Sequence, residues 1–312
     1  MSYREQLPQL SGDRLFITDG GLETTLIFQQ GLDLPQFAAF DLLKSEEGKD
    51  AIRTYFAPYV SIAKENGVGL ILDTATWRAN PDWAAQLGYS EEELDAAIRE
   101  SVELAEEIAE GVGDDAPVVL DGVVGPRGDG YVAEDPMSAE EAEQYHAVQI
   151  RTFADTAADM VSAITMTYAE EAVGITHAAN QEGLPVAISF TVETDGRLPS
   201  GQGLPEAVAQ VDDETDNGPA YFMINCAHPT HFADTVEEGG SWRDRIGGIR
   251  ANASTRSHAE LDEAEDLDDG DPVELAEQYR ALRGPLPNLI VLGGCCGTDD
   301  RHVGEICRAW LS

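Results

Sequence analysis

The sequence predicts an α/β protein of the (β/α)8 barrel class, a TIM barrel. Eight short apolar runs recur along the 312 residues, and longer stretches with a helical spacing of apolar residues lie between them. The short runs are apolar at successive positions, which is typical of parallel strands buried on both faces. Eight strand–helix units in about 300 residues fit a closed barrel whose working face lies at the carboxyl ends of the strands.

The predicted strands are the apolar runs themselves, which are rich in Val, Ile and Leu. In chain order they are Leu15–Asp19, Leu70–Ala75, Val118–Val124, Met160–Thr165, Val186–Val192, Tyr221–Cys226, Ile246–Ala251 and Leu289–Gly293. An open, doubly wound sheet is the competing architecture. The number of strands and the lack of a G-x-G-x-x-G motif after the first strand favour the barrel.

Several intervening helices carry start signals. Ser90 with Glu93, and Ser138 with Glu141, have the spacing of capping boxes, and Pro272 suits the first turn of a helix. We therefore expect helices over Ser90–Gly111, from Ser138 to about Thr156, and from Pro272 to near Gly284. The acidic run at 260–271 is predicted to be an exposed loop. No linker divides the chain, so residues 1–312 are predicted to form a single domain.

Acidic residues outnumber basic ones 59 to 19, which gives a formal net charge of −40. Such a field repels nucleic acids and anionic membranes, so neither is expected as a partner. The charge is typical of a protein that stays soluble in concentrated salt. No apolar run approaches the ~20 residues of a membrane span, and residues 1–11 lack the apolar segment of a secretory signal. We therefore expect a cytoplasmic location.

Three cysteines lie at the ends of two predicted strands. Cys226 ends the sixth strand, and Cys295 and Cys296 follow the eighth, between glycines that allow a sharp turn. Three thiols with an open fourth position are the pattern of a catalytic zinc site. The alternatives for Cys295 and Cys296 are buried thiols or a disulfide between the two. Cys307, on the last predicted helix, is expected to be a core thiol.

Other strand ends offer contacts for a small substrate. Gly20 and Gly21 leave backbone N–H groups available for an anion, and Asp19 could meet an ammonium group. Glu23 lies in the same turn, and Thr76 and Trp77 follow the second strand. The faces of Trp77 and nearby Trp83 either attract a sulfonium or ammonium group through cation–π contacts or pack under the loop.

Taken together, these motifs resemble the homocysteine S-methyltransferase family. The resemblance rests on Asp19-Gly20-Gly21, on Asn225-Cys226 and on the run from Gly293 to Thr298, and it covers nearly the whole chain. It implies a (β/α)8 barrel with Zn2+ held by Cys226, Cys295 and Cys296. It also implies that Asp19 and the backbone of Gly20 and Gly21 hold the amino-acid end of homocysteine, and that Asn225 lies at the substrate site.

The sequence departs from the family at the fourth strand. Family members usually carry Glu-Thr-x-Pro there, and the glutamate binds the substrate ammonium group. Here the segment is Ile164-Thr165-Met166-Thr167, so Ile164 replaces the glutamate. An apolar residue at this point favours an acceptor thiol that lacks the α-amino group or carries it elsewhere. The alternative is that the loop is realigned and that Glu170 or Glu171 on the following helix supplies the charge.

We therefore predict a zinc-dependent S-methyltransferase. It would move a methyl group from a sulfonium or ammonium donor to a zinc-bound thiol, either homocysteine, giving methionine, or a related thiol, with no catalytic residue beyond the zinc site. Two alternatives are a zinc- and thiol-binding barrel without turnover, and a redox enzyme that uses Cys295 and Cys296. The expected partners are a small-molecule thiol acceptor and a methyl donor. The sequence neither requires nor excludes a homo-oligomer.

Overall fold

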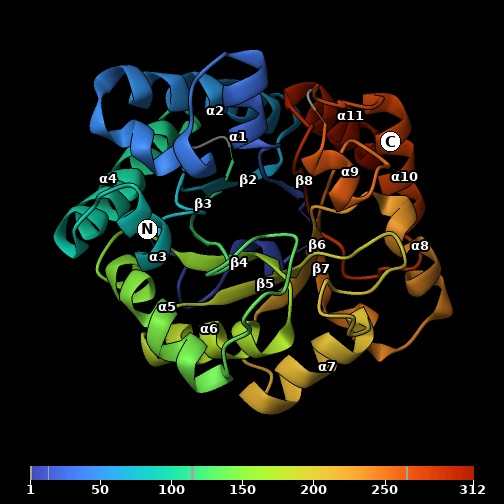
Figure 1. The fold of residues 1–312 in the computed structure, drawn as a ribbon. Helices are drawn as coiled ribbons and strands as arrows, with labels where there is room; N and C mark the ends of the chain where they lie inside the picture. The colour runs from blue at the N-terminus through green and yellow to red at the C-terminus, as the bar shows by residue number, and fades with distance from the viewer. Residues whose placement is uncertain (1, 13, 114–115, 265) are drawn as a thin grey trace.

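The eight predicted strands form a closed parallel barrel (Figure 1). The computed structural model describes residues 2–12, 14–113, 116–264 and 266–312. Each strand pairs with the next along the chain, and β1 closes the ring by pairing with β8, where Phe16 lies opposite Val291. Every predicted strand boundary lies within two residues of the observed one, so the predicted fold class is confirmed. The strands are β1 (Phe16–Ile17), β2 (Gly69–Asp73), β3 (Val118–Val124), β4 (Met160–Met166), β5 (Val186–Phe190), β6 (Tyr221–Asn225), β7 (Ile246–Ala251) and β8 (Val291–Gly294).

Helices surround the barrel as an outer ring (Figure 1). Both predicted capping boxes are present, since the hydroxyls of Ser90 and Ser138 accept hydrogen bonds from the backbone N–H groups of Glu93 and Glu141. The helices of the ring are α2 (Glu46–Asn66), α4 (Glu91–Glu110), α5 (Ala139–Ala154), α6 (Ala169–Gln181), α7 (Leu204–Thr215), α8 (Pro229–Glu238), α10 (Pro272–Leu282) and α11 (Asp300–Leu311). Short helices α1 (Leu22–Thr24), α3 (Pro81–Gln86) and α9 (His258–Asp262) lie in the loops that follow strands.

Two apolar cores stabilise this arrangement. One lies between the strands and the outer helices, and the other fills the barrel with inward-facing residues such as Ile71, Val119 and Met223. Leu7 from the N-terminal segment joins the inner core. Arg4 in the same segment donates from Nε to the carbonyl of Ala158, just before β4 begins. The N-terminal segment therefore closes the amino-terminal end of the barrel, and the opposite end is left for a site.

The acidic run at 260–271 is only partly a loop, which corrects the prediction. Its first residues belong to α9, because Ser257 and Glu260 form a capping box that starts a helix. Further along, Asp268 accepts a hydrogen bond from the Ser254 hydroxyl at 2.7 Å, and Asp269 pairs with Arg301 at 2.8 Å. These contacts hold the run against the barrel near the end of β8.

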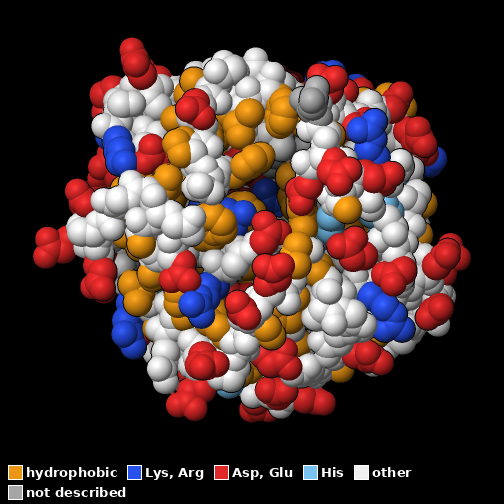
Figure 2. Space-filling view, viewed as in Figure 1, with side chains coloured by type: hydrophobic (Ala, Val, Ile, Leu, Met, Phe, Trp, Pro, Cys, Tyr) orange, Lys and Arg blue, Asp and Glu red, His pale blue; other side chains and the backbone are white. Residues whose placement is uncertain are grey.

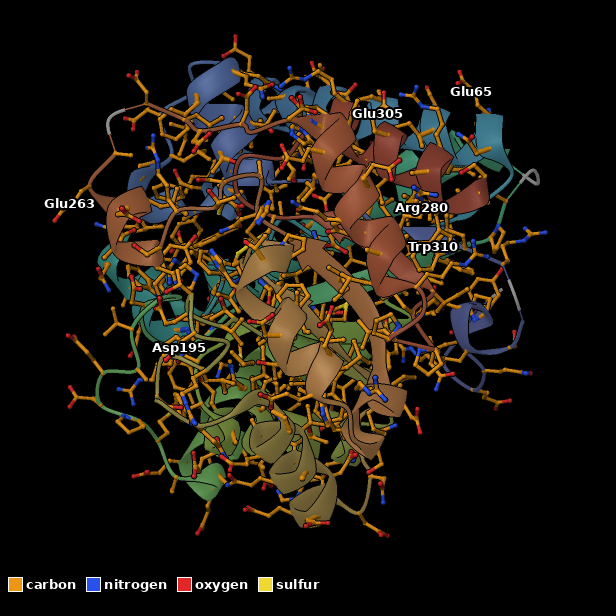
Figure 3. The ribbon with its side chains drawn as sticks, turned by 90° about the vertical axis from the view of Figure 1, so that its right-hand side faces the viewer. Glu65, Asp195, Glu263, Arg280, Glu305 and Trp310 are labelled. Carbon is orange, nitrogen blue, oxygen red and sulfur yellow. A yellow bond between two sulfur atoms is a disulfide. The ribbon has the colours of Figure 1, made fainter. Side chains whose placement is uncertain are left out.

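Acidic side chains cover much of the visible surface. They are spread over the face in Figure 2, and Glu65 and Glu263 point outward at opposite sides of Figure 3. This distribution agrees with a charge that serves solvation more than one local binding surface. Within the described part of the chain, no helix has both the length and the apolar character that a membrane span needs.

Candidate metal centre and substrate cavity

Three cysteines meet at the carboxyl ends of β6 and β8. Cys226 directly follows β6, and Cys295 and Cys296 directly follow β8. Their sulfur atoms all lie within 4.8 Å of one another. Cys226 and Cys295 are joined by a disulfide, and Cys296 is a free thiol. The structure thus brings together the three predicted metal ligands, and it does not show the alternative disulfide between Cys295 and Cys296.

This donor set suits zinc when all three thiols are reduced. Thiolates are zinc ligands, and a catalytic zinc site takes three protein ligands and leaves one position for substrate or water. Because metal binding requires deprotonated thiols, a bound metal and the Cys226–Cys295 disulfide are alternative states of the same three side chains. Cys307 is fully buried on α11 and belongs to the outer core, as predicted.

Glycines let the turn after β1 approach the cysteine turn. Gly21 donates its backbone N–H to the carbonyl of Thr298 at 3.0 Å, and Gly294 donates to the carbonyl of Asp19 at 2.8 Å. A Cβ atom at Gly20 would lie 2.7 Å from the Thr298 carbonyl oxygen, which is too close. The N–H of Gly21, predicted to meet a substrate anion, is therefore engaged within the protein. This glycine pair serves close packing of two turns.

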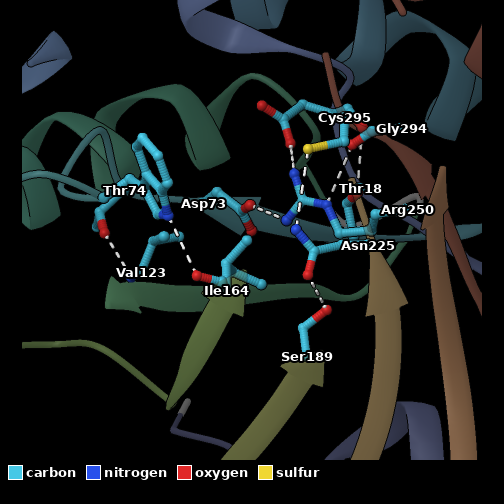
Figure 4. A network of polar contacts seen from close by, with 12 residues as sticks. Thr18, Asp73, Thr74, Val123, Ile164, Ser189, Asn225, Arg250, Gly294 and Cys295 are labelled. Carbon is cyan, nitrogen blue, oxygen red and sulfur yellow. Dashed lines mark hydrogen bonds and ion pairs between the residues drawn. The ribbon is translucent and has the colours of Figure 1, made fainter. Parts of the chain in front are cut away.

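Asn225 supports the cysteine site from behind. Its Oδ1 accepts hydrogen bonds from the Ser189 hydroxyl at 2.6 Å (Figure 4) and from the Thr165 backbone N–H at 3.0 Å. Its Nδ2 donates to the Thr165 hydroxyl at 2.8 Å. Thr165 and Cys226 both have positive φ values, 69° and 49°, which are costly for residues with a side chain. Asn225 is fully buried and does not line the cavity. In the structure Asn225 therefore holds the Thr165 turn in place from outside the cavity lining.

We expect Asn225→Leu to lower the free energy of unfolding by about 3 kcal/mol. The change leaves the buried N–H of Thr165 without its acceptor, and an unsatisfied buried donor costs about 1–3 kcal/mol before the lost Ser189 and Thr165 hydroxyl contacts are added. Denaturant melts of the reduced protein measure the change. Ser189→Ala is the matched control, since it removes one contact of Asn225 and should cost about 1 kcal/mol. Equal losses for the two variants would contradict this role of Asn225.

A cavity of about 330 Å³ opens beside the cysteines at the carboxyl end of the barrel. Figure 2 shows this face hollowed near its centre, with apolar and basic side chains inside. The predicted contacts that line the cavity are Asp19, Gly20, Gly21, Glu23, Trp77 and Ile164. Thr76 does not line it, because this residue is fully buried and its hydroxyl donates to the Val123 carbonyl at 2.7 Å. Thr76 therefore ties the end of β2 to β3.

Arg250 forms a buried ion-pair cluster on the cavity wall. It extends from β7, donates to Asp73 (Figure 4), and pairs with Asp19 at 2.5 Å. The second carboxylate oxygen of Asp19 accepts a hydrogen bond from the Tyr55 hydroxyl at 2.9 Å. Burial raises the pKa of Asp19 to about 7, although the Arg250 charge opposes that shift. Both oxygens of Asp19, predicted to hold a substrate ammonium group, are thus engaged by the protein itself.

Another arginine occupies the aromatic wall. The guanidinium carbon of Arg78 lies 4.2 Å from the ring centre of Trp77 and 4.0 Å from that of Trp83. Its Nη1 donates to the carbonyl of Gly128 at 2.8 Å. Burial lowers the pKa of Arg78 to about 10, so this side chain stays charged at neutral pH. Faces of both indole rings, where a sulfonium or ammonium group was one of the two predicted roles, therefore already hold a cation of the chain.

Tyr131 and His258 support the thiols from the loop side. The Tyr131 hydroxyl donates to the Cys296 sulfur at 3.4 Å, and the Tyr131 ring stacks on the His258 ring at a centre distance of 4.1 Å. A ring nitrogen of His258 lies 2.7 Å from the carbonyl oxygen of Cys226. Burial raises the pKa of Cys296, and the hydrogen bond from Tyr131 only partly opposes this shift. A nearby cation favours the thiolate form of such a thiol.

A family model for homocysteine S-methyltransferases matches residues 16–310, nearly the whole barrel. The chain belongs to the homocysteine S-methyltransferase family. One relative is a selenocysteine methyltransferase from Astragalus bisulcatus, which is 26% identical in an alignment of 253 residues. The match covers 72% of this chain and 71% of that protein. The resemblance inferred from the cysteine and glycine motifs is therefore confirmed.

Solved structures of the homocysteine methyltransferase MmuM from Escherichia coli have the same fold. The oxidised form matches with a TM-score of 0.75 and the metallated form with a TM-score of 0.73, both at 19% sequence identity. Each match covers 95% of this chain, together with 95% of the oxidised chain and 96% of the metallated chain. At this level of identity the likeness concerns the fold.

Within this homocysteine S-methyltransferase domain, Ile164 lies where the sequence placed it. It belongs to β4, lines the cavity and joins the inner apolar core. Its carbonyl accepts a hydrogen bond from the indole N–H of Trp77 at 3.1 Å. An apolar side chain therefore faces the cavity at the end of β4.

Arg250 and Tyr131 are residues of this family member that the motifs did not single out. Arg250 lies within the apolar run at 246–251, which indicates a strand and not a site. Tyr131 lies in a loop that carries no motif for a metal or substrate site. A charged residue near the carboxyl end of a buried strand was the available signal for Arg250, because buried arginines need partners. No pattern in the sequence pointed to the contact between Tyr131 and Cys296.

Proposed function

We propose that this chain methylates a small thiol and that Zn2+ held by reduced Cys226, Cys295 and Cys296 is its cofactor. The single observation that carries the proposal is the convergence of the three sulfur atoms within 4.8 Å beside the cavity. Membership of the homocysteine S-methyltransferase family supports methyl transfer to sulfur. The acceptor is homocysteine or a related thiol, and the donor carries its methyl group on a sulfonium or ammonium centre.

The chemistry needs an ionised acceptor sulfur and a dry, oriented pair of reactants. Zinc in such a site keeps a thiol deprotonated at neutral pH. The bond between the donor and its methyl carbon breaks while a bond forms between that carbon and the acceptor sulfur. The electron pair of the broken bond stays on the donor, whose sulfur or nitrogen centre becomes uncharged. The acceptor proton is released to solvent on binding, so no general base is required.

The chain's own residues hold this geometry. Asn225 fixes the turns of Thr165 and Cys226, Tyr131 contacts Cys296, and the glycine turn after β1 packs on the cysteine turn. Trp77 and Ile164 line the cavity with apolar surface that excludes water from the reacting atoms. Small-molecule partners, a single domain over residues 1–312 and a cytoplasmic location are proposed with this function.

A thiol–disulfide function is the second candidate, and the Cys226–Cys295 disulfide is the observation that favours it. The test uses reduced, zinc-loaded protein with several thiols and with S-methylmethionine, betaine and S-adenosylmethionine as donors. We expect methyl transfer that persists with excess reductant and stops with a chelator. Tight thiol binding without turnover on any donor would instead indicate a binding protein. Disulfide exchange that is insensitive to the chelator would indicate the redox function.

A further inference from the structure

We propose that Arg250 makes the cavity select an acceptor thiol that carries an anionic group and lacks an ammonium group, which places the acceptor among the mercapto acids. This inference rests on the proposed function and specifies the substrate class of the same site. It follows from the position of two buried arginines on the cavity wall, Arg250 and Arg78, and from the carboxylates that they already engage.

Arg250 fills the place for a cation beside Asp19. The Arg250 guanidinium lies between Asp19 and Asp73 and bonds to both, and Tyr55 takes the remaining oxygen of Asp19. A substrate ammonium group that approached Asp19 would meet a buried like charge and would find both oxygens of Asp19 already bonded. Of the two carboxylates that Arg250 engages, only Asp73 keeps an oxygen, Oδ1, without a hydrogen-bond partner among the described residues. Removing an ammonium group from water without a partner is costly. Ile164, on the opposing strand β4, offers it only apolar contact.

Donors for an anion are present on the same wall. A guanidinium has five N–H donors, and among the described residues Arg78 uses Nη1 alone, toward Gly128. Its Nε is buried with no hydrogen-bond partner among those residues, although the side chain is held flat between Trp77 and Trp83. Arginine in a fixed plane suits carboxylate and sulfonate groups. Arg78 is therefore the contact that we assign to the anionic end of the acceptor.

The remaining acids of the cavity wall allow this assignment. They are Glu23, Asp129 and Asp262. Burial raises the pKa of Glu23 to about 7, so this carboxyl group carries less than full charge near neutrality. Burial also raises the pKa of Asp262. Asp129 accepts a hydrogen bond from the backbone N–H of Tyr131 at 2.7 Å.

A set of matched thiols tests the inference on the reduced, zinc-loaded chain. Homocysteine is compared with 4-mercaptobutyrate, which lacks only the ammonium group, and with 3-mercaptopropylamine, which lacks only the carboxylate. Calorimetric binding constants and kcat/KM are measured for each. We expect 4-mercaptobutyrate to exceed homocysteine by at least about tenfold and 3-mercaptopropylamine to be the poorest, because one lost charge-assisted contact is worth about tenfold or more. The sulfonate analogue 3-mercaptopropanesulfonate shows whether the anion must be a carboxylate.

Variants then assign the selectivity to Arg250. Arg250→Met frees Asp19, so the ratio of 4-mercaptobutyrate to homocysteine should fall by about tenfold or more, whereas Arg250→Lys keeps a cation and should keep the order of the wild type. Arg78→Met should weaken 4-mercaptobutyrate until it resembles 1-butanethiol. Arg127→Gln is the control, because Arg127 pairs with Asp82 outside the cavity and its side chain is 46% exposed. Zinc content and circular dichroism report whether each variant folds.

The outcomes separate the two levels of the proposal. A wild-type preference for homocysteine, or an unchanged ratio in folded Arg250→Met, overturns the role of Arg250 and leaves the methyltransferase function intact. If Arg250→Met does not fold, the wild-type thiol series and Arg78→Met still decide the question. Failure of every thiol to bind the zinc-loaded chain overturns both the proposed function and this inference.

Discussion

We expect Cys296→Ser to lose its zinc and to lose methyl transfer by more than about a hundredfold. Changing a residue that only supports a metal ligand typically lowers metal affinity or activity by about 10- to 100-fold. Cys296 is proposed as a direct ligand, so a larger loss is expected. Its sulfur lies within 4.8 Å of the other two sulfurs, and the hydroxyl of serine is a poor substitute for a thiolate toward zinc. Cys226→Ser and Cys295→Ser should behave alike.

Elemental analysis of reduced, purified protein is the direct measurement. The wild type should hold about one zinc per chain, the number that a single three-cysteine site takes. Cys307→Ala is the control, because this thiol is buried in the outer core on α11 and lies outside the cluster. It should keep the zinc and lose only some stability. Single serine variants that retain full zinc would refute the assignment of these ligands.

Molar salt should raise the melting temperature of this protein by about 10 °C or more between about 0.1 M and about 3 M KCl. The formal net charge of −40 gives strong mutual repulsion among surface carboxylates, and salt screens that repulsion. In a domain of this size each kcal/mol of added stability raises the melting temperature by about 2–4 °C, so a gain of a few kcal/mol suffices.

A charge variant distinguishes screening from a general effect of salt. Glu106 and Glu110 are exposed in the last turn of α4, where negative charge also opposes the helix dipole. The double change Glu106→Gln with Glu110→Gln should raise the melting temperature in dilute buffer and reduce its dependence on KCl. Glu107 is left unchanged because it pairs with Arg53 at 2.9 Å. A melting temperature that is flat or falls with KCl would contradict the screening argument.

The order of strands and helices, and the position of the three cysteines, could be predicted from the sequence. Strands buried on both faces leave continuous apolar runs, and helix starts such as Ser90 with Glu93 leave local signals within four residues. Once the runs are assigned to a parallel barrel, the carboxyl ends of all strands must meet at one end. Cys226 and Cys295 are 69 residues apart in the chain, yet the topology alone predicts that they converge.

What each side chain does at that end was decided only by the tertiary structure. Asp19, Gly21 and Asn225 were predicted to contact substrate, but Arg250 and Tyr55 engage Asp19, Thr298 accepts from Gly21, and Asn225 lies behind Thr165. These partners come from strands and helices far away in sequence. Side-chain direction also depends on local register, which shifts on β6 and β7 next to Met223. A sequence pattern determines which residues reach the site, whereas the charges that neutralise one another there depend on distances of a few ångströms across the barrel.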